Sequence, residues 1–207
     1  NDAKSGYKVI GIELNVGLVN SINLGKVQME GVVNSEINTL IASGNFKASK
    51  DFSEIIDTEI FVICVPTPLD HQSMPDLTYL KSAAKAIAPY IKQGALVILE
   101  STVAPGTTRN FLIPIIENNS RLARSEFLVA FSPERIDPLN QKWNIKNTPK
   151  LVSGLTDEAY LNAIRFYGSF IDNLIKCDSL EIAETSKLLE NSFRLVNISF
   201  INEFSIF

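Results

Sequence analysis

Short apolar runs of strand length alternate along the chain with segments whose apolar residues recur at helical spacing. The run 60–65 is the clearest strand, and its unbroken apolar character is typical of a parallel strand covered on both faces. The other expected strands are 6–13, 46–49, 95–100, 127–131 and 151–154, and the expected helices are 18–24, 36–43, 53–57, 77–91, 105–117, 157–167 and 186–207. This alternation predicts an α/β fold, a Rossmann-like, doubly wound and mainly parallel sheet followed by the start of a long helix.

Ligands of doubly wound sheets bind beyond the carboxyl ends of the strands, so the residues that follow each strand are the informative ones. Glu13 closes an early strand and precedes a helix, the place where a carboxylate accepts hydrogen bonds from the ribose of a dinucleotide. The alternative is a solvated carboxylate, because the chain contains no G-x-G-x-x-G sequence.

Two further strand ends carry prolines and small polar residues, namely Val65, Pro66, Thr67, Ser101 and Thr102. The first group stands at the end of the strand 60–65, where it either faces a nucleotide or simply terminates the strand. The second group precedes a helix N-terminus, whose N–H groups either attract an anion or are capped by Ser101 or Thr107.

Two other sets of polar residues are candidates for acid–base and oxyanion chemistry. Glu134 follows the strand 127–131, and a carboxylate there suits a general base or a water-positioning group. The alternative is that Glu134 and Arg135 pair to stiffen the loop. Lys187 and Asn191 are four residues apart and share a helix face, where they either stabilise an oxyanion or are solvated.

Composition argues against several classes of protein. The 19 Lys and Arg and 23 Asp and Glu residues leave a net charge of −4, which offers no attraction to the phosphates of a nucleic acid. One His and two cysteines, Cys64 and Cys177, do not form a structural zinc site or a disulfide framework. No apolar run approaches the ~18 residues of a membrane span. We therefore expect a cytoplasmic protein that binds no metal, nucleic acid or membrane.

Five sequence stretches carry a combined signal, because each is weak by itself but their order is specific. They are VIGIELN at 9–15, FVICVPTPLD at 61–70, LESTVAPGTT at 99–108, AFSPERIDP at 130–138 and ETSKLLENSFRLVNISFINE at 184–203. Together they resemble the UDP-glucose/GDP-mannose dehydrogenase family over nearly the whole chain. The resemblance implies an NAD-dependent, four-electron oxidation of the C6 hydroxymethyl of a nucleotide sugar to a carboxylate, in polysaccharide precursor synthesis. The SPER sequence resembles the UDP-N-acetylhexosamine branch (UDP-N-acetylglucosamine or -mannosamine) more than the UDP-glucose branch.

The resemblance also implies a role for each candidate residue. Glu13 would bind the adenosine ribose, and the rest of the NAD site would be lined by Val65, Pro66, Thr67, Ser101 and Thr102. Thr102 and Glu134 would hold the water that ends the reaction, with Glu134 as acid/base. Lys187 would stabilise the alkoxide and oxyanion states, and Asn191 would be the second donor. The nucleotide sugar would contact Glu134, Arg135, Lys187 and Asn191.

The same resemblance divides the chain into an NAD-binding domain, residues 1–178, and the start of a central helical domain, residues 179–207. In the family that helix joins two subunits, so we expect a homodimer of the longer protein. We expect truncation at both ends, because the family's Gly-rich loop would precede Asn1 and its catalytic cysteine would follow Phe207. Neither Cys64 nor Cys177 matches that cysteine motif, so we expect the 207-residue chain by itself not to turn over.

Two other functions stay open at this point. One is a β-hydroxyacid dehydrogenase-like oxidoreductase, which the CVPTP and SPER sequences argue against. The other is a catalytically inactive remnant that acts as a binding or assembly module, for which the apolar helix 186–207 would supply the contact surface.

Overall fold

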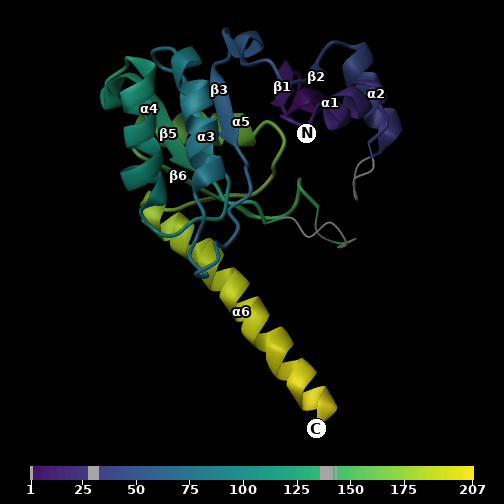
Figure 1. The fold of residues 1–207 in the computed structure, drawn as a ribbon, viewed down its shortest axis with the longest axis vertical. Coiled ribbons are helices and arrows are strands. Elements are labelled where there is room, and N and C mark those ends of the chain that lie inside the picture. The colour runs from purple at the N-terminus through teal and green to yellow at the C-terminus, as the bar shows by residue number, and fades with distance from the viewer. Residues whose placement is uncertain (1, 28–32, 136–141, 143) are drawn as a thin grey trace.

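A five-stranded sheet forms the centre of the molecule in the computed structural model, which describes residues 2–27, 33–135, 142 and 144–207. Its strands, in spatial order, are β3 (Ile60–Ile63), β4 (Leu96–Leu99), β5 (Leu128–Phe131), β6 (Lys150–Gly154) and β7 (Leu174–Lys176). Strands β3, β4 and β5 are parallel, β6 is antiparallel to β5, and β7 is parallel to β6. A separate parallel pair, β1 (Val9–Ile12) and β2 (Phe46–Ser49), lies beyond β3 (Figure 1).

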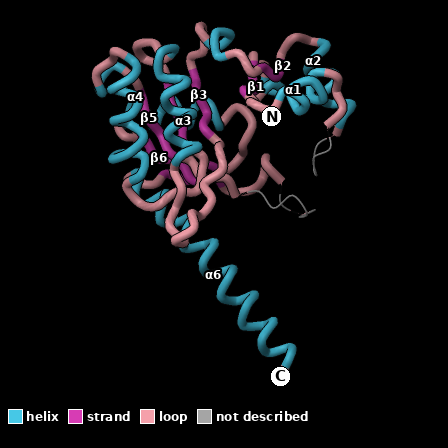
Figure 2. Tube along the Cα trace, in the orientation of Figure 1, coloured by secondary structure: helices cyan, strands magenta, loops and turns pink. Residues whose placement is uncertain are grey.

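Helices cover both faces of the five-stranded sheet, which confirms the predicted doubly wound α/β fold. The helices are α1 (Val16–Asn23), α2 (Asn34–Ala42), α3 (Thr78–Ile87), α4 (Ile113–Ser120), α5 (Asp157–Tyr167) and α6 (Leu180–Ile206). Helices α3 and α4 lie on one face and α5 on the other (Figures 1 and 2).

A π-helical turn, Thr108–Leu112, leads directly into α4. The predicted helix 157–167 begins where expected, because the Thr156 side chain accepts a hydrogen bond from the Ala159 N–H.

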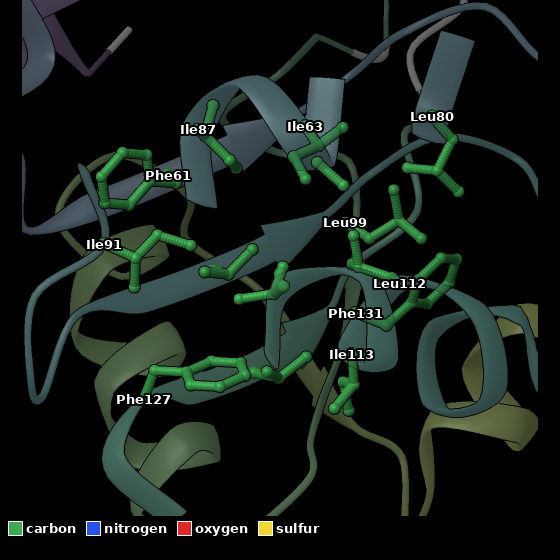
Figure 3. Close-up of a cluster of buried hydrophobic side chains, with 14 of the residues drawn as sticks. Phe61, Ile63, Leu80, Ile87, Ile91, Leu99, Leu112, Ile113, Phe127 and Phe131 are labelled. Carbon is green, nitrogen blue, oxygen red and sulfur yellow. The ribbon is translucent and has the colours of Figure 1, made fainter. Parts of the chain in front are cut away.

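Strand β4 lies at the centre of the core, because alternate side chains of a strand point to opposite faces. Val97 and Leu99 join the cluster under α3 and α4, which Figure 3 shows in close-up, and Leu96 and Ile98 join the cluster under α5. Strand β4 is therefore covered on both faces. The same was predicted for the strand 60–65, and that prediction is wrong for β3, where the side chain of Val62 is exposed.

Helix α6 leaves the body of the molecule as a single rod (Figure 1). It begins at Leu180, earlier than the predicted 186, because the Ser179 side chain caps it and Leu180 and Ala183 are buried in the core. From Leu189 onward every residue of α6 is exposed. Among the described residues, no helix is long and apolar enough to cross a membrane.

Candidate active site

The loops that follow β3 and β4 are joined by two short side-chain hydrogen bonds. The Thr67 hydroxyl donates to the Thr102 carbonyl at 2.7 Å, and the Ser101 hydroxyl donates to the Val65 carbonyl at 2.7 Å. Four of the five residues predicted to line the NAD site therefore lie together beyond the carboxyl ends of β3 and β4. The fifth, Pro66, lies between two of them and is exposed.

Glu13 stands at the carboxyl end of β1, as predicted. Its carboxylate accepts a hydrogen bond from the Asn15 backbone N–H at 2.8 Å, and Asn15 in turn caps α1. This local bond orients the carboxylate at the start of a helix. In the described part of the chain, Glu13 has no hydrogen bond or ion pair with the loops after β3 and β4.

A bidentate ion pair brings the loop after β5 against α6. The Arg135 guanidinium donates to both carboxylate oxygens of Glu190, at 3.2 and 2.7 Å, and also donates to the Pro149 carbonyl at 3.3 Å. Arg135 holds the pKa of Glu190 below its usual value by hydrogen bonding to the charged form. The sequence prediction missed Glu190, although it lies inside the matched stretch 184–203.

The predicted oxyanion residues lie beside this ion pair. The Lys187 side chain is only 15% exposed, and its ammonium lies 3.8 Å from the Glu190 carboxylate. Asn191 follows on the same helix and is exposed. Glu134 precedes Arg135 and accepts the Arg135 backbone N–H at 2.6 Å. Glu134 and Lys187, which are far apart in the sequence, thus border one Arg135–Glu190 contact.

A buried lysine that sequence reasoning missed stands behind Glu134. The Lys150 ammonium lies 2.8 Å from the Glu100 carboxylate and 3.8 Å from that of Glu134. The Tyr167 hydroxyl donates to the same Glu100 oxygen at 2.6 Å, and burial, followed by the charge of Glu100, raises the pKa of Tyr167. A lysine that immediately precedes an apolar strand was the only sequence signal for this group.

The helix that follows β4 already has an anion at its N-terminus. The fully buried Glu184 of α6 accepts hydrogen bonds from the Gly106 N–H at 2.6 Å, the Thr108 N–H at 2.8 Å and the Thr108 hydroxyl at 2.6 Å. The predicted cap from Ser101 or Thr107 is wrong, because the Thr107 hydroxyl donates instead to the Ala104 carbonyl and the Ser101 hydroxyl to the Val65 carbonyl. A carboxylate from the protein therefore stabilises these N–H groups.

These residues fit the two ends of a dinucleotide better than its centre. Glu13 offers a carboxylate at a strand end for a ribose, and the loops after β3 and β4 are held together by two hydroxyl–carbonyl hydrogen bonds. The helix N-terminus after β4 does not serve the phosphates, because Glu184 occupies it. Among the described residues, no group of three or more His, Cys, Asp and Glu side chains is arranged to bind a metal ion.

Known proteins are similar to this chain in sequence and in fold. The chain is 34% identical over 206 residues to UDP-N-acetyl-D-mannosamine dehydrogenase of Pyrococcus horikoshii, covering 99% of this chain and 49% of that protein. It is 32% identical over 200 residues to UDP-N-acetyl-D-glucosamine 6-dehydrogenase of Pseudomonas aeruginosa, covering 96% of this chain and 47% of that protein. The solved structure of UDP-D-ManNAc dehydrogenase from Pyrococcus horikoshii superposes with a TM-score of 0.92 at 33% identity, over 99% of this chain and 49% of that one.

The chain thus spans about half the length of the curated relatives it matches. Residues 2–171 match the model of the NAD-binding domain of the UDP-glucose/GDP-mannose dehydrogenase family. This match selects the nucleotide-sugar dehydrogenases over the β-hydroxyacid dehydrogenase alternative. The chain belongs to the UDP-glucose/GDP-mannose dehydrogenase family and carries that family's NAD-binding domain.

Proposed function

We propose that the protein containing this chain oxidises the C6 hydroxymethyl of a UDP-N-acetylhexosamine to the uronate, with NAD as the electron acceptor. Two relatives named for UDP-N-acetyl sugars, at 34% and 32% identity, support this substrate class. The observation that carries the proposal is the Arg135–Glu190 ion pair, because it joins the loop of Glu134 to the helix of Lys187. An acid/base and an oxyanion stabiliser must border the same reacting carbon.

NAD would supply the oxidising power when bound, one molecule for each of the two successive two-electron oxidations. In this proposal Lys187 stabilises the negative charge on the C6 oxygen with its ammonium, and the Asn191 amide donates a second hydrogen bond. The low exposure of the Lys187 side chain strengthens that interaction, because little water screens it. Glu134 and Thr102 hold the water of the final hydrolytic step, and Glu134 accepts its proton.

The cofactor and the substrate occupy adjoining sets of residues in this proposal. Glu13 accepts hydrogen bonds from the adenosine ribose, and the remaining cofactor contacts come from Val65, Pro66, Thr67, Ser101 and Thr102. Arg135 contacts the nucleotide sugar at the border of its ion pair with Glu190. The chain divides into an NAD-binding domain, 1–178, and the start of a central helical domain, 179–207.

We further propose that α6 pairs two subunits of the longer protein. The exposed part of the helix carries many large apolar side chains, among them Leu189, Phe193, Val196, Phe200 and Phe204. An exposed apolar surface of this extent favours association with another chain. The enzyme would work in the cytoplasm and supply a uronate for polysaccharide synthesis.

The test compares the protein at its full encoded length with the 207-residue chain. We expect the full-length protein to form two NADH per UDP-N-acetylhexosamine and the 207-residue chain to form none. E134Q and K187M should each lower kcat by about 10²-fold or more. The matched control E158Q changes an exposed glutamate of α5 and should leave kcat unaltered. Absence of NADH from the full-length protein with every nucleotide sugar would favour the inactive remnant.

A further inference from the structure

We propose that Lys150 is a positioning residue that holds the carboxylate of Glu134 in place for the proposed reaction. This inference rests on the proposed function, because Glu134 is the acid/base of that reaction. It concerns a residue outside all five sequence stretches that resemble the family.

The antiparallel pairing of β6 with β5 explains how Lys150 reaches the site. Ala130 pairs with Gly154 and Phe131 with Ser153, so the start of β6 lies beyond the carboxyl end of β5. Lys150 is the first residue of β6, and its side chain is 7% exposed. If β6 ran parallel to β5, Lys150 would lie at the opposite end of the strands, near the amino end of β5.

The buried ammonium of Lys150 lies between the residues that follow two neighbouring strands. It is 2.8 Å from a Glu100 oxygen after β4, and 3.5 Å from the Pro133 carbonyl and 3.8 Å from a Glu134 oxygen after β5. A buried charge requires charged or strongly polar partners, and these groups supply them. Lys150 thereby links the loop of the acid/base to the interior of the sheet.

Glu100 and Tyr167 in turn hold Lys150. The Tyr167 hydroxyl donates to Glu100 at 2.6 Å, and the Tyr167 ring lies with its centroid 4.8 Å from the Lys150 ammonium. The ammonium is therefore held by a carboxylate and by an aromatic face, which leaves it little freedom. A fixed cation at this place can set the position of the more exposed partner.

Glu134 is that partner, because its side chain is 48% exposed. Arg135, the next residue, is tied to Glu190 of α6, so the backbone is anchored on one side. Lys150 attracts the carboxylate from the other side. Without the Lys150 cation, we expect the Glu134 carboxylate to shift from this position while the backbone stays anchored. Even a displacement of about 1 Å at a reacting group can cost ~10²-fold in rate.

A purely structural role for Lys150 would be to neutralise Glu100, and turnover in two backgrounds separates the two roles. In the full-length enzyme we expect K150M to lower kcat by at least about tenfold, with little change in the KM for NAD, and K150R to restore most of the loss. If Lys150 acts through Glu134, K150M should cause no further loss in an E134Q background. Equal losses in both backgrounds would mean that Lys150 acts only on the fold.

Lys176 provides a matched control for this experiment. Its ammonium also has a carboxylate, Asp157 at 3.9 Å, and an aromatic ring, Tyr160 at 4.7 Å, but it lies on β7. K176M should leave kcat unaltered. An equal fall in K176M and K150M would contradict the proposal.

The Cys64 thiol offers a second readout that needs no turnover and uses the 207-residue chain. Partial burial raises the pKa of Cys64, and the negative charges of Glu100, Asp2 and Glu134 raise it further. E134Q removes one of these charges, so iodoacetamide should alkylate Cys64 faster in E134Q than in wild type at fixed pH. This gain should be smaller in the K150M background, where the Glu134 carboxylate is no longer held in place, and K150R should restore the full gain.

The two readouts keep the two proposals distinguishable. If the full-length protein forms no NADH, the proposed function fails, and the Cys64 rates still decide whether Lys150 holds the Glu134 carboxylate. An effect of E134Q on the Cys64 rate that is equal in the wild-type and K150M backgrounds would overturn the positioning role. The buried Cys177 serves as the internal control for unfolding, because it should stay unreactive in every variant.

Discussion

Replacing Glu184 by Ala should destabilise the chain by about 3–4 kcal/mol at neutral pH. The Glu184 side chain is fully buried, and its carboxylate accepts two backbone N–H groups and one hydroxyl at 2.6 to 2.8 Å. A buried donor that loses its partner costs roughly 1–3 kcal/mol. The N–H groups of Gly106 and Thr108 cannot turn away, whereas the Thr108 hydroxyl can rotate, so we count two donors at about 1.5–2 kcal/mol each.

A urea unfolding experiment on the 207-residue chain, followed by circular dichroism, measures this loss. The matched control is E181Q, one turn earlier on α6, which removes the charge of a carboxylate that pairs with Arg109 at 2.6 Å. Glu181 is 34% exposed, so we expect its substitution to cost at most about 1 kcal/mol. E184Q keeps one acceptor oxygen and should fall between the two.

The contrast between these variants tests the reasoning. A loss of less than about 1 kcal/mol in E184A would show that water replaces the carboxylate without cost, and so that the contact does not anchor α6. Equal losses in E184A and E181Q would also contradict it, because burial is the property in which the two glutamates differ most. The slope of the unfolding free energy against urea should stay constant across the set, otherwise the comparison fails.

Three other predictions follow from contacts of α6 and of the cofactor loops. Arg109 lowers the pKa of Glu181 from 4.5 to about 2. This pair therefore stabilises the fold fully above pH 4.5, and its contribution is lost as the pH falls toward 2. The free energies of unfolding of wild type and E181Q should converge in that pH range, and a constant difference would contradict the pairing. A double-mutant cycle of R135Q and E190Q should give a coupling energy of about 1 kcal/mol, and additivity would show that the ion pair contributes nothing. T67V removes a 2.7 Å hydrogen bond and should lower the free energy of unfolding in urea by about 1 kcal/mol. It should also weaken NAD binding measured by titration, and an unchanged NAD affinity would show that this loop is not part of the NAD site.

Local signals explain why most secondary structure was predictable. The helix Asp157–Tyr167 has a capping threonine in front of it and apolar residues at helical spacing, and both signals act within a few residues. The strand β4 is apolar at every position because both its faces are buried. Strand β7 was missed because it has only three residues, Leu174–Lys176, and two of its side chains are exposed.

The candidate site likewise has a part that the sequence predicts and a part that it does not. Glu13, Thr67 and Thr102 could be named from the sequence because each follows a strand, and the end of a strand is a local property. The sequence, through its five ordered stretches, also indicated the family that the comparisons confirm. The sequence did not show which groups these candidate residues contact.

The sequence by itself therefore determined most of the strands and helices and the residues at the strand ends, and only the tertiary structure decided which charges meet. Glu184 and Thr108 are 76 residues apart, Tyr167 and Glu100 are 67 apart, and Arg135 and Glu190 are 55 apart. Lys150 reaches Glu100 only because β6 runs antiparallel to β5. A hydrogen bond or an ion pair requires two groups within a few ångströms, and for residues this far apart in the chain that distance depends on the order and direction of the strands.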